Sequence, residues 1–245
     1  MRLPQAVAFD LDGTLTESFR PPAQGIADSL ERLSAMVPIA VMSAGNFPRI
    51  EGYFTSIFEP RSEVRAFIFS SNAAEGYVWK NKRWGRVYQF SIAEKERARI
   101  VSVIKRGVTE ANIGSERDHQ ILERDSNIAF AAVPLDASLD DRNAWDPDRS
   151  KRTRLKSVLT RELPEYEVVI GGPVSINITR KGINKAYGVR WLAQHLGIPT
   201  REMLFIGDAL YEGGNDAVVI PTGIQTRETT GPEETAHIIE ELLGG

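Results

Sequence analysis

A small set of side chains in this 245-residue sequence carries the groups needed to hold a hard cation beside a phosphate. It consists of carboxylates, an ammonium group and a hydroxyl, and its members are Asp10, Asp12, Asp208, Asp216, Lys185 and Ser43. Carboxylate oxygens are ligands that Mg²⁺ prefers, and an ammonium group offsets the charge of a phosphoryl group. A hydroxyl can donate to phosphoryl oxygens, and a carboxylate can be the nucleophile that forms an aspartyl-phosphate.

Each member of this set also has a common structural explanation. An Asp-x-Asp-Gly stretch is usually a turn, a lone serine is often a helix cap, and a lone lysine is usually solvated. What favours the chemical explanation is that these residues occur together, each after an apolar run or at the start of a helix.

The elements that would position these residues are short apolar runs separated by helical patterns. The expected buried strands are residues 6–11, 38–42, 65–70 and 203–206, and the expected helices beside them are 26–33, 50–58, 184–196 and 232–243. This alternation is typical of a doubly wound parallel sheet, in which ligands bind at the carboxyl ends of the strands. The sequence therefore predicts an α/β fold whose strand ends bring the chemical groups together.

The middle of the chain has a different character. Residues 76–89 predict a β-hairpin, and from about 90 to 180 helical stretches (93–104, 149–163) alternate with strand-like ones (127–133, 166–170, 174–179). We therefore expect one α/β domain made of residues 1–89 and 181–245, interrupted by an inserted α+β domain over 90–180.

Composition excludes several classes of protein. The absence of cysteine rules out disulfides, a thiol nucleophile and thiolate-bound metals. No apolar run approaches the roughly 18 residues of a membrane span, so we expect a cytoplasmic protein without a membrane partner. The net charge of −3 argues against nucleic acid. The cation-rich stretch 149–156 (RSKRTRLK) is interpreted as a solvated helix face.

Residues 9–16 (FDLDGTLT) resemble the first motif of the haloacid dehalogenase-like (HAD) phosphotransferases. The resemblance implies that Asp10 is the nucleophile and Asp12 the general acid and base. It implies that Ser43 and Lys185 belong to the second and third motifs, and Asp208 and Asp216 to the fourth. Mg²⁺ would then be held by Asp10, Asp208, Asp216 and the backbone carbonyl of Asp12. The inserted domain resembles the type IIB cap of this superfamily.

Within that superfamily, the sequence is most similar to the eukaryotic-type α-phosphomannomutases. The similarity lies in residues 171–178 (GGPVSINI), 182–185 (GINK), 207–216 (GDALYEGGND) and 229–238. It implies substrate contacts by a further group of residues, some of them next to Ser43 and others in the cap, namely Arg20, Gly45, Asn46, Arg124, Arg142, Ser175 and Asn177. It also implies a homodimer formed through the cap, although the sequence leaves the oligomeric state open.

Several positions depart from the mutase pattern. Asn177 stands where the mutases have a sugar-binding aspartate, and Ala137 stands where they have a phosphate-binding arginine. A mutase needs a strongly cationic cap to hold the distal phosphate of a bisphosphate intermediate, whereas a phosphatase needs only water and one phosphate.

These departures favour a Mg²⁺-dependent phosphatase that hydrolyses a phosphorylated sugar or a similar small metabolite through an aspartyl-phosphate on Asp10. The alternatives are a phosphomannomutase-like sugar-phosphate mutase and a phosphosugar-binding protein without turnover. The identity of the substrate and the presence of a second cation stay open.

Overall fold

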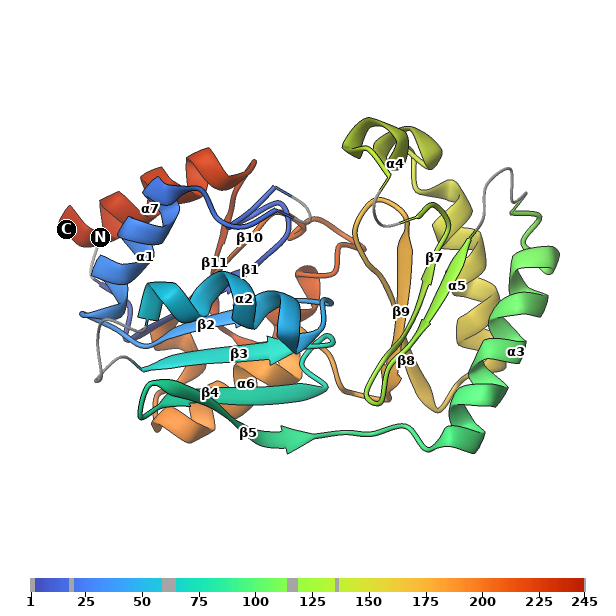
Figure 1. Ribbon diagram of the computed structural model, residues 1–245, viewed down its shortest axis with the longest axis horizontal. Coiled ribbons are helices and arrows are strands. Elements are labelled where there is room, and N and C mark those ends of the chain that lie inside the picture. Colours follow the sequence, from blue (N-terminus) through green and yellow to red (C-terminus); the bar gives the residue numbers. More distant parts are fainter. Residues whose placement is uncertain (1–2, 18–19, 59–64, 114–118, 135–136, 245) are drawn as a thin grey trace. The chain divides into compact units, whose positions relative to one another are not determined.

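The structure is a computed structural model that describes residues 3–17, 20–58, 65–113, 119–134 and 137–244 (Figure 1). The chain divides into two compact units. We call Met1–Gln89 with Asn184–Gly245 the core unit, and Phe90–Ile183 the inserted unit. The fold is of the predicted α/β class, with one mostly parallel sheet and one separate antiparallel sheet.

The sheet of the core unit has the strand order β11-β10-β1-β2-β3-β4-β5. The pairs from β11 to β3 are parallel, and their strands are β1 (Ala6–Asp10), β2 (Ile39–Met42), β3 (Ala66–Ser70), β10 (Met203–Gly207) and β11 (Gln225–Glu228). Every residue of β1, β2, β3 and β10 is buried, which is why these strands are continuous apolar runs.

Helices cover both faces of this sheet. Alternate residues of the strands, including Phe9 and Val41, form one face of the sheet. This face packs against α1 (Gln24–Ser34), α2 (Phe47–Phe58) and α7 (Pro232–Gly244). The other face, including Ala8 and Phe205, packs against α6 (Lys185–Leu196) and the 3₁₀ helix η2 (Ala217–Thr222). A second 3₁₀ helix, η1 (Thr200–Glu202), leads into β10. The result is a helix–sheet–helix sandwich, as the prediction of a doubly wound fold requires.

The predicted hairpin is confirmed as β4 (Glu75–Lys80) and β5 (Arg83–Gln89), an antiparallel extension of the sheet. Its two turn residues, Asn81 and Lys82, have φ of 53° and 59°. Two successive left-handed residues make a type I′ turn, whose twist matches that of the paired strands.

The inserted unit is an antiparallel sheet with the order β6-β7-β9-β8. Its strands are β6 (Gln120–Glu123), β7 (Ile128–Ala131), β8 (Tyr166–Ile170) and β9 (Ser175–Arg180). The long helices α3 (Glu94–Glu110) and α5 (Ser150–Glu162) lie on the same side of this sheet (Figure 1). A short helix, α4 (Leu139–Trp145), precedes α5.

Because side chains alternate along a strand, the two faces of this sheet differ sharply. Ile128, Phe130 and Ile176 belong to the apolar core beneath α3 and α5. Their neighbours along the strands, Ser175 and Asn177, belong to the opposite face. The face opposite the helices therefore carries two of the predicted cap residues, Ser175 and Asn177.

The prediction that residues 149–156 form a solvated cationic face is wrong for Arg152. This side chain is buried and forms an ion pair with buried Asp146, with Nε 2.9 Å from Oδ2. Its Nη1 also donates to the carbonyl of Gly172, at 2.5 Å. The amphipathic pattern of the helix predicted Arg152 on the solvated face. It is buried because Asp146, six residues upstream and outside the helix, supplies a buried carboxylate that pairs with it.

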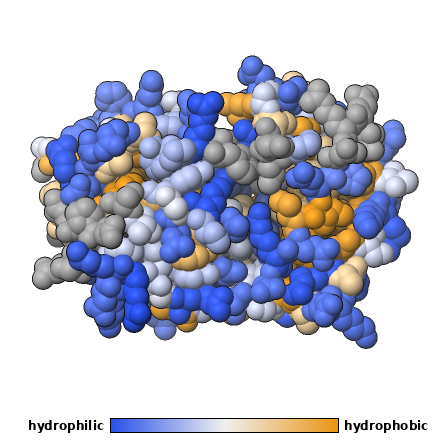
Figure 2. All heavy atoms as spheres, viewed as in Figure 1, coloured by the Kyte–Doolittle hydropathy of each residue, from blue (hydrophilic) through white to orange (hydrophobic). Residues whose placement is uncertain are grey.

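No helix among the described residues is both long enough and apolar enough to cross a membrane. Hydrophilic residues cover most of the face seen in Figure 2, and an apolar group is visible on the inserted unit.

Candidate active site

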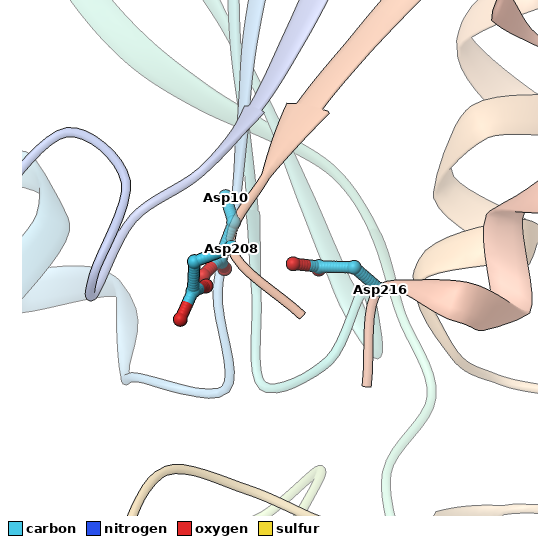
Figure 3. A group of neighbouring side chains, drawn as sticks. All are labelled: Asp10, Asp208 and Asp216. Carbon is cyan, nitrogen blue, oxygen red and sulfur yellow. The ribbon is translucent and has the colours of Figure 1, made fainter. Parts of the chain in front are cut away.

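Three carboxylates converge at the carboxyl end of the core sheet. Asp10 is the last residue of β1, Asp208 directly follows β10, and Asp216 directly precedes η2. Since β1 and β10 are adjacent parallel strands, with Phe9 opposite Ile206, Asp10 and Asp208 leave the sheet at the same level. One carboxylate oxygen of each residue lies within 4.8 Å of the others. Figure 3 shows Asp10 and Asp208 close together and Asp216 pointing toward them.

Lys185 supplies the cation of this cluster. Its side chain is buried, and its Nζ donates to Asp10 Oδ1 and, at 2.5 Å, to Asp216 Oδ1. It is the first residue of α6, where the Asn184 side chain caps the helix by accepting from the backbone N–H groups of Ala186 and Tyr187. One ammonium group facing three carboxylates leaves an excess of negative charge, which suits a further cation.

Two further contacts fix the orientation of the carboxylates. Asp216 Oδ2 accepts from the backbone N–H of Ala209 at 3.1 Å. Gly13, at φ +89°, lies against Asp208, and a Cβ at this position would be 2.6 Å from Asp208 Oδ2. Any side chain at position 13 would therefore displace Asp208.

Burial shifts the pKa values in this cluster. It raises the pKa of Asp10 well above its ordinary value; the Lys185 ammonium opposes that shift, and the charges of Asp216 and Asp208 add to it. Burial and the charge of Asp216 likewise raise the pKa of Asp208. For Lys185, burial lowers the pKa, but Asp10 and Asp216 outweigh burial and keep the ammonium form. The cluster is thus short of positive charge, since carboxyl groups here bind protons more readily than in water.

A second group in the core unit contains Asp12, Ser43 and Arg49. Arg49 forms an ion pair with Asp12 through Nη2, and its Nη1 lies 3.3 Å from Asp12 Oδ1. The same guanidinium lies 3.4 Å from Ser43 Oγ, which also accepts from the backbone N–H of Gly45 at 2.9 Å. Arg49 was not predicted, because an arginine in the first turns of a helix has no distinguishing pattern; its proximity to Asp12 depends on adjacent strands β1 and β2.

The other residues predicted in the core unit lie outside these two groups. Arg20 is exposed, and its Nη1 is 3.8 Å from Glu17 Oε2. Asn46 is also exposed, at the start of α2. Gly45 is placed beside Ser43, and its carbonyl accepts from the backbone N–H of Ser71.

In the inserted unit, Ser175 and Asn177 lie on β9 on the face opposite the helices. Asn177 accepts from Asn127, a buried residue that was not predicted, and Asn127 in turn accepts from Arg124. Arg142 is buried in α4. Of the segment 134–137 that departs from the mutase pattern, Leu135 and Asp136 lie outside the described residues.

The chemistry of this donor set fits Mg²⁺. The three aspartates offer only oxygen ligands and come from three different segments, and the raised pKa values of Asp10 and Asp208 indicate unbalanced negative charge. Asp10, Asp208 and Asp216 are the described residues that would hold the ion.

The Asn184 cap can be tested because it positions Lys185. Asn184→Ala removes the acceptor of two helix N–H groups and is expected to lower the free energy of unfolding by about 1 kcal/mol. Asn184→Asp keeps an acceptor at the positive end of the helix and should stay within about 0.5 kcal/mol of the wild type. Urea unfolding measures both. Equal stability of the alanine variant and the wild type would show that the cap is not needed.

The pKa shifts predict a pH dependence. With raised pKa values, the folded metal-free protein binds more protons than the unfolded chain, starting from the ordinary range of Asp near pH 4. Its stability should therefore fall as the pH rises from that range through the raised values. Mg²⁺ binds the deprotonated carboxylates, so the stabilisation by Mg²⁺ should increase over the same interval. Thermal unfolding from pH 4.5 to 8, with and without Mg²⁺, tests both trends, and opposite slopes would contradict them.

Comparison with known proteins identifies the family. The model of the family described as eukaryotic phosphomannomutase matches residues 26–244. The chain belongs to this family. As a phosphomannomutase-family protein it is part of the HAD superfamily, as its first motif indicated.

Curated relatives match nearly from end to end. The phosphomannomutase of Babesia bovis is 26% identical over 248 residues, with 98% of each chain covered. That of Schizosaccharomyces pombe is 23% identical over 243 residues, covering 97% of this chain and 93% of the relative.

Solved structures share the fold at lower identity. The IMP-bound, N-terminally truncated IMP-nucleotidase of Plasmodium falciparum has a TM-score of 0.73 at 14% identity, covering 99% of this chain and 68% of the other. The sucrose-phosphatase of Synechocystis sp., in complex with sucrose and phosphate, has a TM-score of 0.57 at 15% identity, covering 98% of this chain and 88% of the other. At these identities the likeness shows the fold alone.

Proposed function

We propose that this family member moves a phosphoryl group between two positions of a phosphorylated sugar, the mutase activity that the names of its relatives describe. The observation that carries the proposal is the buried Asp10 at the end of β1, ion-paired to Lys185 and within 4.8 Å of Asp208 and Asp216. Near full-length similarity to phosphomannomutases supports a sugar phosphate as the substrate.

In this mechanism Asp10 attacks the phosphorus atom, its carboxylate oxygen forms the new P–O bond, and the bond to the sugar oxygen breaks. Asp12 gives a proton to the leaving oxygen and takes one back when a hydroxyl of a sugar monophosphate attacks the aspartyl-phosphate, so the intermediate is a sugar bisphosphate, whose other phosphoryl group then returns to Asp10. Both aspartates stand at the same strand end, and the ion pair with Arg49 orients the Asp12 carboxyl group.

The remaining groups bind the phosphoryl oxygens. Lys185 offsets their charge and holds Asp10 in place. Ser43 Oγ already accepts from Gly45 and Arg49, so its hydroxyl hydrogen is directed to another partner, which we propose is a phosphoryl oxygen. Mg²⁺, held by Asp10, Asp208 and Asp216, would neutralise the charge that gathers on the phosphoryl group.

Hydrolysis is the second candidate, and specific residues favour it. Ala137 replaces an arginine and Asn177 an aspartate of the mutase pattern. A weaker hold on the distal phosphate would let water, rather than a sugar hydroxyl, take the phosphoryl group from Asp10. The near full-length relatives nevertheless support the mutase better than the hydrolase that these departures predicted.

The two activities are separated by following mannose 1-phosphate with ³¹P NMR in the presence of Mg²⁺, with and without a hexose bisphosphate. A mutase forms mannose 6-phosphate faster than inorganic phosphate and depends on the bisphosphate. Release of inorganic phosphate alone would establish the hydrolase. No reaction with this substrate or with a broad panel of sugar phosphates would refute both.

A further inference from the structure

The four residues 71–74 that join β3 to β4 have an unusual backbone. Three of them in succession are left-handed, with φ of 54° at Ser71, 57° at Asn72 and 64° at Ala73. None of the three is a glycine, and in this conformation the Cβ of an L-residue lies too close to the following carbonyl oxygen, which costs energy. Such strain persists only where the surrounding structure imposes it, and it is concentrated at functional sites. We call residues 71–74 the left-handed turn.

Two hydrogen bonds fix the left-handed turn to the loop that follows β2. The backbone N–H of Ser71 donates to the carbonyl of Gly45 at 2.8 Å, and that of Asn72 donates to the carbonyl of Ser43 at 2.9 Å. The left-handed turn therefore lies directly beside Ser43, whose hydroxyl we propose binds a phosphoryl oxygen.

On its other side the left-handed turn packs against α6. A Cβ built on Gly188 would be only 3.1 Å from the Cβ of Ala73, so the absence of a side chain at Gly188 permits this close approach. Lys185 lies three residues before Gly188 in α6, and residues with this spacing share one face of a helix. The left-handed turn thus lies between Ser43 and the helix face that carries Lys185, the two residues that would bind the phosphoryl group.

The side chain of Asn72 is buried at this place without a partner for its donor. Asn72 is only 2% exposed, and among the described residues its Nδ2 has no hydrogen-bond partner. A buried donor without a partner costs free energy, so it needs a physical reason. Asparagine tolerates a left-handed φ, but glycine would adopt it with less strain and would bury no unpaired donor. The backbone conformation alone therefore does not account for the amide, whereas a ligand that accepts its hydrogen bond does.

We propose that Asn72 is a further ligand-binding residue of the core unit and that its side-chain N–H donates to an anionic phosphoryl oxygen. An amide N–H needs an acceptor, and its neighbours Ser43 and Lys185 also offer donors, so the atom that all three suit is an oxygen with negative charge. The assignment of this oxygen to the substrate rests on the proposed function, but the binding of phosphate by the amide can be tested without turnover.

The test measures binding of inorganic phosphate to the full chain by isothermal titration calorimetry in the presence of Mg²⁺. Asn72→Gly removes the amide and suits the left-handed backbone. It should weaken phosphate binding by about 10- to 100-fold, the effect of losing a hydrogen bond to a charged group. Its midpoint of thermal unfolding should equal or exceed that of the wild type, because backbone strain and the unpaired donor are both removed. A purely structural asparagine would give the reverse, a lower midpoint with unchanged binding.

The chain offers a matched control in the turn between β4 and β5. Asn81 is exposed and has a φ of 53°, so Asn81→Gly is the same substitution in nearly the same backbone conformation. It should bind phosphate as the wild type does. Asn72→Asp replaces the donor with a negatively charged acceptor and should weaken binding more than Asn72→Gly, whereas Asn81→Asp should leave binding unchanged.

Three results would overturn the proposal. They are equal phosphate binding by Asn72→Gly and Asn81→Gly, retention of binding in Asn72→Asp, and no saturable binding of phosphate by the wild type. If Asn72→Asp does not fold, the two glycine variants decide the case. Failure of the ³¹P assay would refute the proposed activity, but a loss of phosphate affinity confined to the Asn72 variants would stand, so the two failures are distinguishable.

Discussion

Asp10→Asn is expected to lower the rate of phosphoryl transfer by roughly 10⁴- to 10⁶-fold, the loss typical of removing a nucleophile. The amide keeps the shape of the side chain but cannot form the aspartyl-phosphate, because its nitrogen and oxygen are poor nucleophiles. The reason for choosing this carboxylate is structural. Asp10 is buried at the end of the interior strand β1, and Lys185 holds it directly.

The variant should remain folded, because Lys185 keeps its ion pair with Asp216. Asp28→Asn serves as the matched control: Asp28 is exposed on α1 and accepts from Gln24 at 2.8 Å. Steady-state release or transfer of phosphate, together with trapping of labelled phosphoenzyme, measures the effect. Transfer by Asp10→Asn at a rate near that of the wild type would eliminate Asp10 as the nucleophile.

Lys185→Met is expected to lose activity and also to lower the free energy of unfolding by about 3–5 kcal/mol near neutral pH, the range for breaking a buried ion pair. Without the ammonium group, the buried carboxylates of Asp10 and Asp216 face each other and the half-buried carboxylate of Asp208. They can lower their repulsion by binding protons, so the destabilisation should diminish as the pH falls. They can also bind a cation, so added Mg²⁺ should stabilise this variant more than the wild type.

Urea unfolding with and without Mg²⁺ measures both the loss in free energy of unfolding and the stabilisation by Mg²⁺. Lys80→Met, at an exposed lysine of the hairpin, controls for loss of a positive charge. If Mg²⁺ stabilises Lys185→Met no more than it stabilises Lys80→Met, the aspartates do not form the proposed cation site.

The sequence predicts the strands and the site residues well where a wholly apolar run ends in a chemical group. β1, β2, β3 and β10 are recognisable because strands buried on both faces must be wholly apolar, and the chemical groups follow from where those strands end. β11 was not predicted, since its residues (QTRE) are polar and largely exposed at the edge of the sheet. An edge strand is held by main-chain pairing to β10, which leaves no apolar pattern in the sequence.

Side-chain contacts between segments far apart in the chain were harder to predict from the sequence. The meeting of Asp10, Asp208 and Asp216 could be anticipated because parallel strands end at a common edge. The pairing of Asp12 with Arg49, and of Asn177 with Asn127, could not, because it depends on side-chain conformations across neighbouring strands. The burial of Arg152 likewise depends on Asp146, which lies before the helix.

The two places where the chain passes between its units are not equivalent. The first passage, from Gln89 to Phe90, follows an edge strand that carries none of the proposed catalytic groups. The second passage, from Ile183 to Asn184, is followed at once by the cap of α6 and by Lys185. A residue inserted or deleted at the second passage would change the chain directly before the Asn184 cap and the proposed catalytic ammonium of Lys185, whereas the same change at the first would alter only a linker. Length variation in evolution, and the choice of junctions for exchanging the inserted unit between family members, should therefore be tolerated at the first passage and strictly limited at the second.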